Sequence, residues 1–457
     1  MITNYFIVSV SIVVLAFLFF EAFKSERNWV FILILLMPIR DLKLAALVGG
    51  GSLKIGDAFI AFLFGLWIWR GILTKKKTRF IKTKLDLVII LFLVLYAVAL
   101  IWSTDLNFGL VRVSKFIRNY LLYLIIRDVF IEDFEGNFKK ATLAYTVTSI
   151  FIALVFFTLV GFQSIRSISW LAQSETIHST DLLGLRAVQT SGGFLINGPQ
   201  IWLTLTACFI FGSLVLTKGK STRAGKLALI LIFIFISLVT LNRSVIVLLF
   251  VILAVLFWQG RKIKSRRYRK WILVLGVLFL SGAIVFGFVQ VFLKRFTGLA
   301  RDQSMIERKI LATAAVDAFL HSPFIGIGPG SNFSWQSQYD LEPSRLSDNM
   351  YLTVLSETGL LGFVPLLFMI RYWLIYLFKF LRQKDHAAAL NNFVLAILAF
   401  SLGYLTIGLV GQEIESLEPW LMMGLASAFR ILSLRKGAPA VEPDLRSVSL
   451  PVRAMTP

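Results

Sequence analysis

Long apolar runs recur along the whole chain, and they restrict its fold more than any other feature. A helix needs about 17–25 apolar residues to cross the hydrocarbon core of a bilayer, and runs of this length follow one another almost from end to end. Hydrophobic residues make up 57% of the 457 residues, and charged residues only 16%. A soluble domain carries about a quarter charged residues. The sequence therefore predicts an all-α, polytopic transmembrane protein of about 12–13 helices.

The formal charge of +22 does not indicate a protein that binds nucleic acid. The basic residues form short clusters between apolar runs, and such clusters mark cytoplasmic loops. This pattern places the amino terminus outside and the carboxyl terminus in the cytoplasm. It also assigns residues 162–193 and 296–347 to extracytoplasmic loops, the second of which precedes the last three helices. The basic clusters lie at residues 75–84, 218–226 and 261–270.

We expect residues 1–435 to form one integrated transmembrane domain, followed by a disordered cytoplasmic tail, residues 436–457. The first span lacks a preceding basic segment and a clear cleavage site, so it is expected to be a membrane helix and not a signal peptide. The expected spans are residues 5–21, 28–40, 56–73, 86–103, 109–127, 141–161, 194–217, 227–241, 243–259, 271–293, 349–370, 388–410 and 417–433.

The chain is poor in residues that bind transition metals. Cys208 is the single cysteine, and there are only three histidines, which are scattered. An ordinary zinc site needs several such ligands close together. We therefore expect no metal site and no cofactor.

Two outer segments have an unusual pattern. Met305 to Phe319, within the long loop, is amphipathic, and it predicts a partly ordered loop on the membrane surface. Between the cytoplasmic cations Lys226 and Arg261 lie about 34 residues, whereas two full crossings need about 40. We expect two short helices or a hairpin whose tip lies near the outer interface. Arg243 is at that tip, where a guanidinium pairs with an anion or lines a hydrated cavity.

Three residues from distant parts of the chain fall on the same outer side in this topology. They are Arg186 in the first outer loop, Arg243 at the hairpin tip and Asp348 at the start of the span after the long loop. Guanidinium groups bind phosphate oxygens through paired donors, and a carboxylate accepts a proton from an attacking hydroxyl. We predict these three as catalytic residues, with Arg243, Arg186, Arg308 and Asn349 contacting a diphosphate donor.

Structural interpretations of the same residues remain open. Asp348 or Asn349 could only cap the helix that follows. Glu357 lies about half a helical turn round from Asp348, so it is expected to bind a neighbouring helix or backbone. Gly359 and Gly362 are expected to be close-packing positions between helices.

The cations have alternatives as well. Arg243 could reach the outer interface as an amphipathic side chain, and Arg186 could be solvated. Arg112, Lys115 and Arg118 recur every three residues near the outer end of the fifth span. They could attract a donor phosphate or bind anionic lipid headgroups.

Several short motifs resemble one known family. Residues 348–362 read D-N-M-Y-L-T-V-L-S-E-T-G-L-L-G, and residues 323–333 read P-F-I-G-I-G-P-G-S-N-F. They resemble the bacterial O-antigen ligase and O-antigen polymerase family, in which a loop-end P-x-x-G-x-G-x-x-x-F element precedes (H/D)-N-x-x-L-x-x-L-x-E-x-G-x-x-G. Residues 242–244 are similar to the family's S-R-G hairpin tip, and residues 186–199 resemble its R-x-x-G-x-F-x-N-P-N element imperfectly. The resemblance covers roughly residues 180–410.

The resemblance implies a metal-independent enzyme at the outer face of the bacterial cytoplasmic (inner) membrane, and a single displacement would invert the configuration of the anomeric carbon. The enzyme would be a glycosyltransferase with a polyprenyl-diphosphate-linked glycan as donor and a glycan, lipid or protein as acceptor. The family's ligases carry histidine where Asp348 stands, so proton acceptance carries over to Asp348 and phosphate binding does not.

Two questions stay open at this point. One is whether the chain ligates or polymerises glycan. The other is whether it is instead a flippase or exporter of lipid-linked oligosaccharide, which would need charged groups spread through a cavity across the bilayer.

Overall fold

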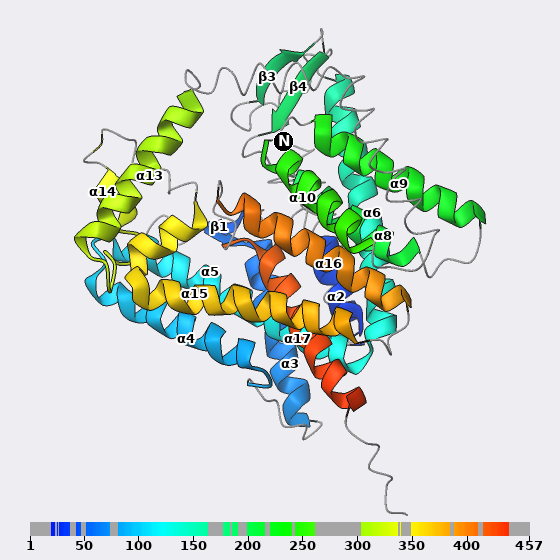
Figure 1. Cartoon of the computed structure of the whole chain (residues 1–457), viewed down its shortest axis with the longest axis horizontal. Coiled ribbons are helices and arrows are strands. Elements are labelled where there is room, and N and C mark those ends of the chain that lie inside the picture. The colour runs from blue at the N-terminus through cyan, green and yellow to red at the C-terminus, as the bar shows by residue number, and fades with distance from the viewer. Residues whose placement is uncertain are drawn as a thin grey trace, which may run out of the picture.

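The computed structural model describes residues 20–22, 25, 27–36, 43–46, 52–73, 81–162, 177–182, 185–190, 199–214, 220–239, 243–260, 303–336, 339, 349–383, 388–409 and 415–437. This part of the chain consists mostly of helices that pack side by side, with two small hairpins at one edge (Figure 1). The expected span 271–293, most of the first span and the tail beyond Gly437 lie outside the described residues.

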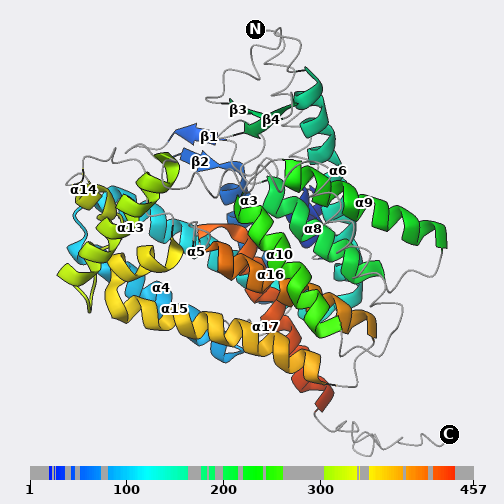
Figure 2. The ribbon, with the colours of Figure 1, turned by 45° about the horizontal axis from the view of Figure 1, so that its top comes forward.

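The helices fall where the apolar runs predict them, and Figure 2 shows their arrangement from a second side. Every other expected span contains a helix, because the apolar length needed for a crossing fixes each element. The helices are α2 (Arg27–Leu36), α3 (Ile55–Leu73), α4 (Lys84–Val98), the 3₁₀ helix η2 (Ala99–Trp102), α5 (Leu106–Glu132), α6 (Phe134–Phe162), α8 (Pro199–Leu214), α9 (Lys220–Val239), α10 (Arg243–Gly260), α13 (Gln303–His321), α14 (Asn332–Gln336), α15 (Met350–Arg382), α16 (Ala388–Ile407) and α17 (Leu417–Gly437).

Within the described residues, three helical segments are long and apolar enough to cross a membrane: Lys84–Trp102, Met350–Arg382 and Leu390–Ile407. α5 is long as well, but it contains several charged residues and is therefore less apolar than these three segments. The helical, membrane-type architecture is therefore as expected. α15 is longer than the span predicted at 349–370, since it continues to Arg382.

The all-α expectation omitted two antiparallel hairpins. β1 (Lys43–Ala46) pairs with β2 (Ser52–Lys54), and β3 (Ile177–Leu182) pairs with β4 (Leu185–Thr190). Both lie in connections between apolar runs, where short strands leave little hydrophobic signal.

The two helices expected between residues 226 and 261 are present, but the first begins earlier than expected. α9 has 20 residues and α10 has 18, because α9 begins at Lys220 and not after Lys226. Lys226 lies inside α9 and donates to Ser213 Oγ of α8 over 3.0 Å. With such a partner a lysine can lie inside a helix. The expectation instead placed the start of this helix after the last residue of the basic cluster.

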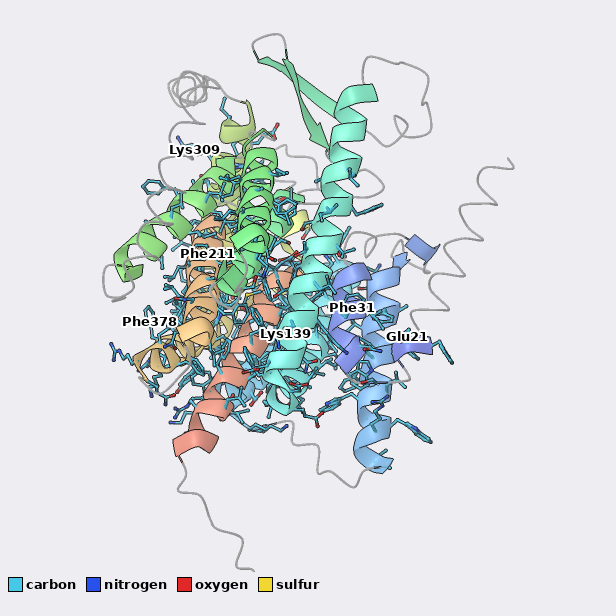
Figure 3. The ribbon with its side chains drawn as sticks, turned by 90° about the vertical axis from the view of Figure 1, so that its right-hand side faces the viewer. Glu21, Phe31, Lys139, Phe211, Lys309 and Phe378 are labelled. Atoms are coloured by element: carbon cyan, nitrogen blue, oxygen red, sulfur yellow. The ribbon has the colours of Figure 1, made fainter. Side chains whose placement is uncertain are left out.

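Apolar and aromatic side chains fill the contacts between helices. α15 packs along α4, α5 along α17, and α10 along α16. One aromatic cluster joins α5, α6, α8, α15, α16 and α17, and its closest ring pair, Phe138 and Phe393, has centroids 4.2 Å apart. Figure 3 shows α2 beside α6, with Phe31 and Lys139 labelled.

A buried polar cluster ties the start of α4 and the last part of α5 to the middle of α17. The fully buried Arg127 and Asp86 form an ion pair of 2.5 Å. Tyr123 donates to the same carboxylate over 2.6 Å and contacts Ser427 Oγ at 2.9 Å. Because each charged group has a partner, the cluster holds the three helices together without an isolated charge in the interior.

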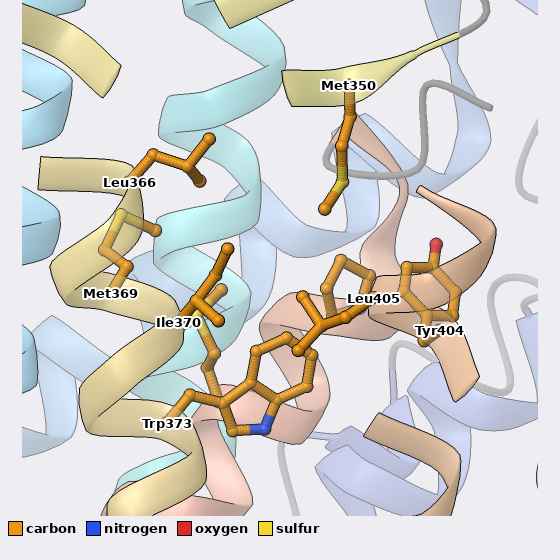
Figure 4. Close-up of a pocket in the computed structure, with 9 residues that line it drawn as sticks. Met350, Leu366, Met369, Ile370, Trp373, Tyr404 and Leu405 are labelled. Atoms are coloured by element: carbon orange, nitrogen blue, oxygen red, sulfur yellow. The ribbon is translucent and has the colours of Figure 1, made fainter. Parts of the chain in front are cut away.

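A small cavity lies between α15, α16 and α17 (Figure 4). Met350, at the start of α15, is on one side of it, and Trp373 and Tyr404 are on the other. The remaining lining side chains are apolar: Leu366, Met369, Ile370, Leu405, Pro419 and Met423. A lining of this kind does not suit a diphosphate, which needs cationic or hydrogen-bonding groups.

Candidate functional site

α15 is broken at Gly359, and the segment after α13 supplies the hydrogen bonds that the break removes. In a continuous helix the amides of Leu360 and Leu361 would donate to the carbonyls of Ser356 and Glu357. They donate instead to the carbonyls of Pro323 and Phe324, over 2.9 and 3.1 Å. Each backbone donor released by the break therefore has a new partner.

The released acceptors of α15 are satisfied by the same segment. The amide of Ile327 donates to the Ser356 carbonyl, and the amide of Gly328 donates to the Glu357 carbonyl, both over 2.9 Å. Residues 323–328 thus exchange four backbone hydrogen bonds with residues 356–361. We call this arrangement the interlock.

Two glycines make the interlock possible. Gly359 has φ +59° and ψ −158°, a backbone region that is almost restricted to glycine. Gly326 has φ +72°, and a Cβ there would lie 2.3 Å from the carbonyl carbon of Glu357. The expectation that Gly359 is a helix-packing position is therefore wrong, because its role is to let the helix break where the loop backbone approaches.

The next two glycines bring the loop against the turn between α4 and α5. A Cβ on Gly328 would lie 2.6 Å from Ser103 Cα, and one on Gly330 would lie 2.6 Å from the amide of Gly109. Ser103 Oγ donates to the Pro329 carbonyl over 2.7 Å. The loop is consequently held between α15 and the α4–α5 turn. Figure 1 shows α13 and α14 at this end of the bundle.

Glu357 is the centre of the contacts beneath the loop. Its carboxylate is fully buried and accepts from the amide of Gly330 over 3.0 Å and from Asn332 Nδ2 over 3.2 Å. Tyr96 of α4 and Arg112 of α5 also donate to it. The expectation that Glu357 binds neighbouring elements is confirmed, and it joins three of them.

The three cations in the first half of α5 have carboxylate partners within the chain. Arg112 pairs with Glu357 and also with Glu415, the latter over 2.5 Å. Lys115 pairs with Glu415 over 2.9 Å, and Arg118 pairs with Asp57 over 2.6 Å. These cations were expected to meet an external phosphate or lipid headgroup, but the structure assigns them to internal ion pairs.

Glu415 closes this network at the start of α17. Burial acts to raise the pKa of Glu415, but the adjacent Arg112 and Lys115 cations outweigh it, so that the pKa lies below its ordinary value. Its backbone carbonyl also accepts from Asn119 Nδ2 over 3.0 Å. Ionised Glu415 therefore holds α17 against α5.

Asn349 is the N-cap of α15. Its Oδ1 accepts from the amides of Tyr351 and Leu352 over 3.0 and 3.1 Å. Asn349, and not Asp348, thus occupies the N-cap position of α15. Asp348 itself lies outside the described residues.

Exchanging Asn349 separates this capping role from donor binding. Asn349→Ala is expected to destabilise the protein by about 0.5–2 kcal/mol, because two amides lose their acceptor. Asn349→Ser keeps a capping oxygen, and we expect it to restore most of the loss in thermal midpoint. If Asn349→Ser is as stable as the natural protein but inactive, Asn349 also contacts the donor.

The other predicted site residues are placed by their backbones. Arg243 is the first residue of α10, Arg308 lies within α13, which packs on α15, and Arg186 lies in β4 opposite Asp181. The connection that was expected to hold Arg186 therefore contains a hairpin at this point. The side chains of Arg186 and Arg243 lie outside the description.

Arg243 begins α10, which packs along α16. Leu248 of α10 lies against Gly403 of α16, where a Cβ would be 2.5 Å from the leucine Cδ1. Five residues further along α16, the Gly408 carbonyl accepts from the amide of Met350 over 2.9 Å.

The sequence did not single out the ion-pair network. Tyr96, Arg112 and Glu415 come from three separate helical regions, and Arg112 and Glu357 are 245 positions apart. The available signal was charge inside long apolar segments, which usually has a function or an internal partner.

Comparison with known families now bears on this arrangement. Residues 227–369 match a family model described as O-antigen ligase. Over this stretch the chain is similar to the O-antigen ligase family. It contains most of α9, all of α10, α13 and α14, and α15 as far as Met369, so it includes both sides of the interlock. The resemblance expected from the motifs is confirmed over these residues. No curated protein matches the chain.

Proposed function

We propose that the chain is a membrane glycosyltransferase that transfers or polymerises glycan from a polyprenyl-diphosphate-linked donor on the outer face of the cytoplasmic membrane. The match of residues 227–369 to the O-antigen ligase family carries the proposal. The interlock adds support, because it joins the two motifs on which the resemblance rests.

In the proposed reaction an acceptor hydroxyl attacks the anomeric carbon of the donor glycan. The new glycosidic bond forms as the bond from that carbon to the diphosphate oxygen breaks, and the configuration inverts. Asp348 takes the proton of the hydroxyl. Polyprenyl diphosphate leaves with its negative charge stabilised by Arg243 and Arg186, and Arg308 and Asn349 add contacts to the donor.

The arginines take the electrostatic role that a divalent cation has in other diphosphate reactions, so we propose that the transfer needs no metal. The acceptor is a glycan if the enzyme polymerises, and a lipid or protein if it ligates. Both outcomes contribute to surface polysaccharide biosynthesis.

The direct test measures polyprenyl diphosphate released from a labelled donor by purified protein in the presence of a chelator. Asp348→Asn keeps the size of the side chain and removes its basicity, so we expect release to fall at least ~100-fold. Arg243→Ala is expected to slow release as well and to weaken binding of the donor. Arg243→Lys keeps the positive charge and is expected to recover part of both losses.

Asp317→Asn is the matched control, because Asp317 is an α13 carboxylate that contacts Tyr339 and has no part in the proposed reaction. It is expected to release diphosphate at the natural rate. An Asp348→Asn protein of full activity would contradict the role of Asp348. Intact donor that only moves between leaflets would contradict the whole proposal.

A further inference from the structure

Three apolar side chains project from the end of α13 and the loop after it. The exposed fractions are 66% for Leu320, 69% for Phe324 and 42% for Ile325. We call these residues the apolar tip. Contiguous exposed apolar side chains of this size usually mark an interaction surface.

Backbone hydrogen bonds fix the level of the tip along α15. The Phe324 carbonyl accepts from the amide of Leu361, and the neighbouring Pro323 carbonyl accepts from Leu360. The remainder of α15, from these leucines to Arg382, belongs to a segment apolar enough to cross a membrane. The tip therefore lies beside the break in this segment.

The exposed surface of α15 continues into the tip. Leu361, Val364 and Phe368 are exposed and recur at helical spacing, so they share one face. In a membrane-spanning helix, an exposed apolar face of this kind contacts lipid. Phe324 extends that face beyond the break in α15.

α4, which packs along α15, has a similar exposed stripe that continues into η2 and ends at the same level. Its last member, Ile101, is 82% exposed, and the adjacent Ser103 contacts the loop through Pro329. The other members are Leu87, Leu91, Val94 and Val98.

The composition of the loop suits insertion into lipid. From Ala318 to Tyr339 there is no Asp, Glu, Lys or Arg, so no fully charged side chain has to enter the bilayer with the tip. Charged residues occur earlier in α13, where Lys309 is exposed. An apolar end and a charged beginning are the pattern of a segment anchored at a membrane interface.

We infer that the apolar tip inserts into the nearer leaflet of the bilayer, among the acyl chains of bulk lipid. The leaflet is the outer one in the topology that the basic loops predict. Insertion anchors the loop and the end of α13 at the membrane interface. The inference depends on membrane embedding alone and stands whether or not the proposed transferase activity is found.

Site-directed fluorescence tests this inference. Cys208 is the single cysteine and is buried, so a Cys208→Ala background allows one cysteine at a time to carry an environment-sensitive dye. The positions are Phe324→Cys and Ile325→Cys in the tip, Lys309→Cys as the aqueous control and Leu367→Cys, on the exposed face of α15, as the membrane control. Each protein is placed in nanodiscs of phosphatidylcholine and phosphatidylglycerol that hold one copy and no polyprenyl lipid.

We expect the dye at both tip positions to be quenched severalfold more by lipid labelled at acyl carbon 5 than the dye at Lys309, and to be protected from aqueous iodide. Quenching by carbon 5 should exceed quenching by carbon 12 at the tip, since interfacial segments enter only about 5–10 Å, and the order should reverse at Leu367. Two tip positions guard against one variant that fails to fold.

Iodide quenching at both tip positions equal to that at Lys309 would overturn the inference. Protection that appears only after polyprenyl diphosphate is added would assign the tip to the donor lipid, and protection only in discs with two copies would assign it to a second chain. Either of these results would also overturn bulk lipid as the occupant.

Discussion

Gly359→Ala is expected to destabilise the protein by about 3 kcal/mol or more. An alanine cannot adopt φ +59° and ψ −158° without strain, and its Cβ would lie 2.4 Å from the backbone carbon and oxygen of Phe324. Either the loop or the break in α15 has to move, and the four hydrogen bonds of the interlock are lost together. The thermal midpoint in detergent measures the loss, and hydrogen exchange at the amides of Leu360 and Leu361 locates it.

Gly65→Ala provides the matched control. Gly65 lies on an exposed face of α3, and a Cβ there meets nothing within 4 Å. Because alanine favours a helix over glycine, stability is expected to stay level or rise by up to about 1 kcal/mol. Equal losses at both positions would show that the interlock contributes nothing specific.

Gly326→Ala should act on the same interlock from the loop side. Its Cβ would meet the backbone of Glu357 and Thr358. Once one substitution has opened the interlock, the other has little left to disrupt. The loss in Gly326→Ala/Gly359→Ala is therefore expected to fall short of the sum of the single losses.

Arg112→Met is the second substitution with a large expected effect. It removes the cation that lies between Glu357 and Glu415 and leaves two carboxylates without their shared partner. Breaking a buried ion pair in this way costs about 3–5 kcal/mol. We expect a lower thermal midpoint and faster proteolysis between α13 and α15, because Glu357 also holds the loop through Gly330 and Asn332.

Two further variants show whether charge is the cause. Lys115→Met removes the partly exposed partner of Glu415, and we expect a loss of at most about 1 kcal/mol. Adding Glu357→Gln to Arg112→Met removes one uncompensated carboxylate and is expected to recover part of the stability. If the double variant is less stable than Arg112→Met alone, the loss comes from packing and not from charge.

The apolar spans could be read from the sequence because a bilayer imposes one length on every crossing. The amphipathic pattern at Met305–Phe319 likewise located α13, and the polar residue before the apolar run at Met350 located a helix cap. Each of these features depends on a short stretch of sequence.

The interlock could not be read in the same way. Gly359 lies in an apolar run, where glycine commonly serves helix packing, and nothing near it in sequence indicates that residues 323–328 replace its helical partners. The pairing of Arg112 with Glu357 likewise joins residues of α5 and α15. Whether Asp348, Arg243 and Arg186 share one pocket remains a prediction, to be decided by the variants proposed above.

The interlock also constrains the order of biogenesis. Residues 360–382 can enter the bilayer as an apolar segment soon after synthesis, because their own helix satisfies most of their backbone. The amides of Leu360 and Leu361 acquire partners only after the preceding loop folds back onto them. The network around Arg112 is complete only when Glu415 has left the ribosome. A nascent chain that stops before α17 would therefore hold the end of the bundle around the interlock in an immature state, which quality-control proteases could distinguish from the finished protein.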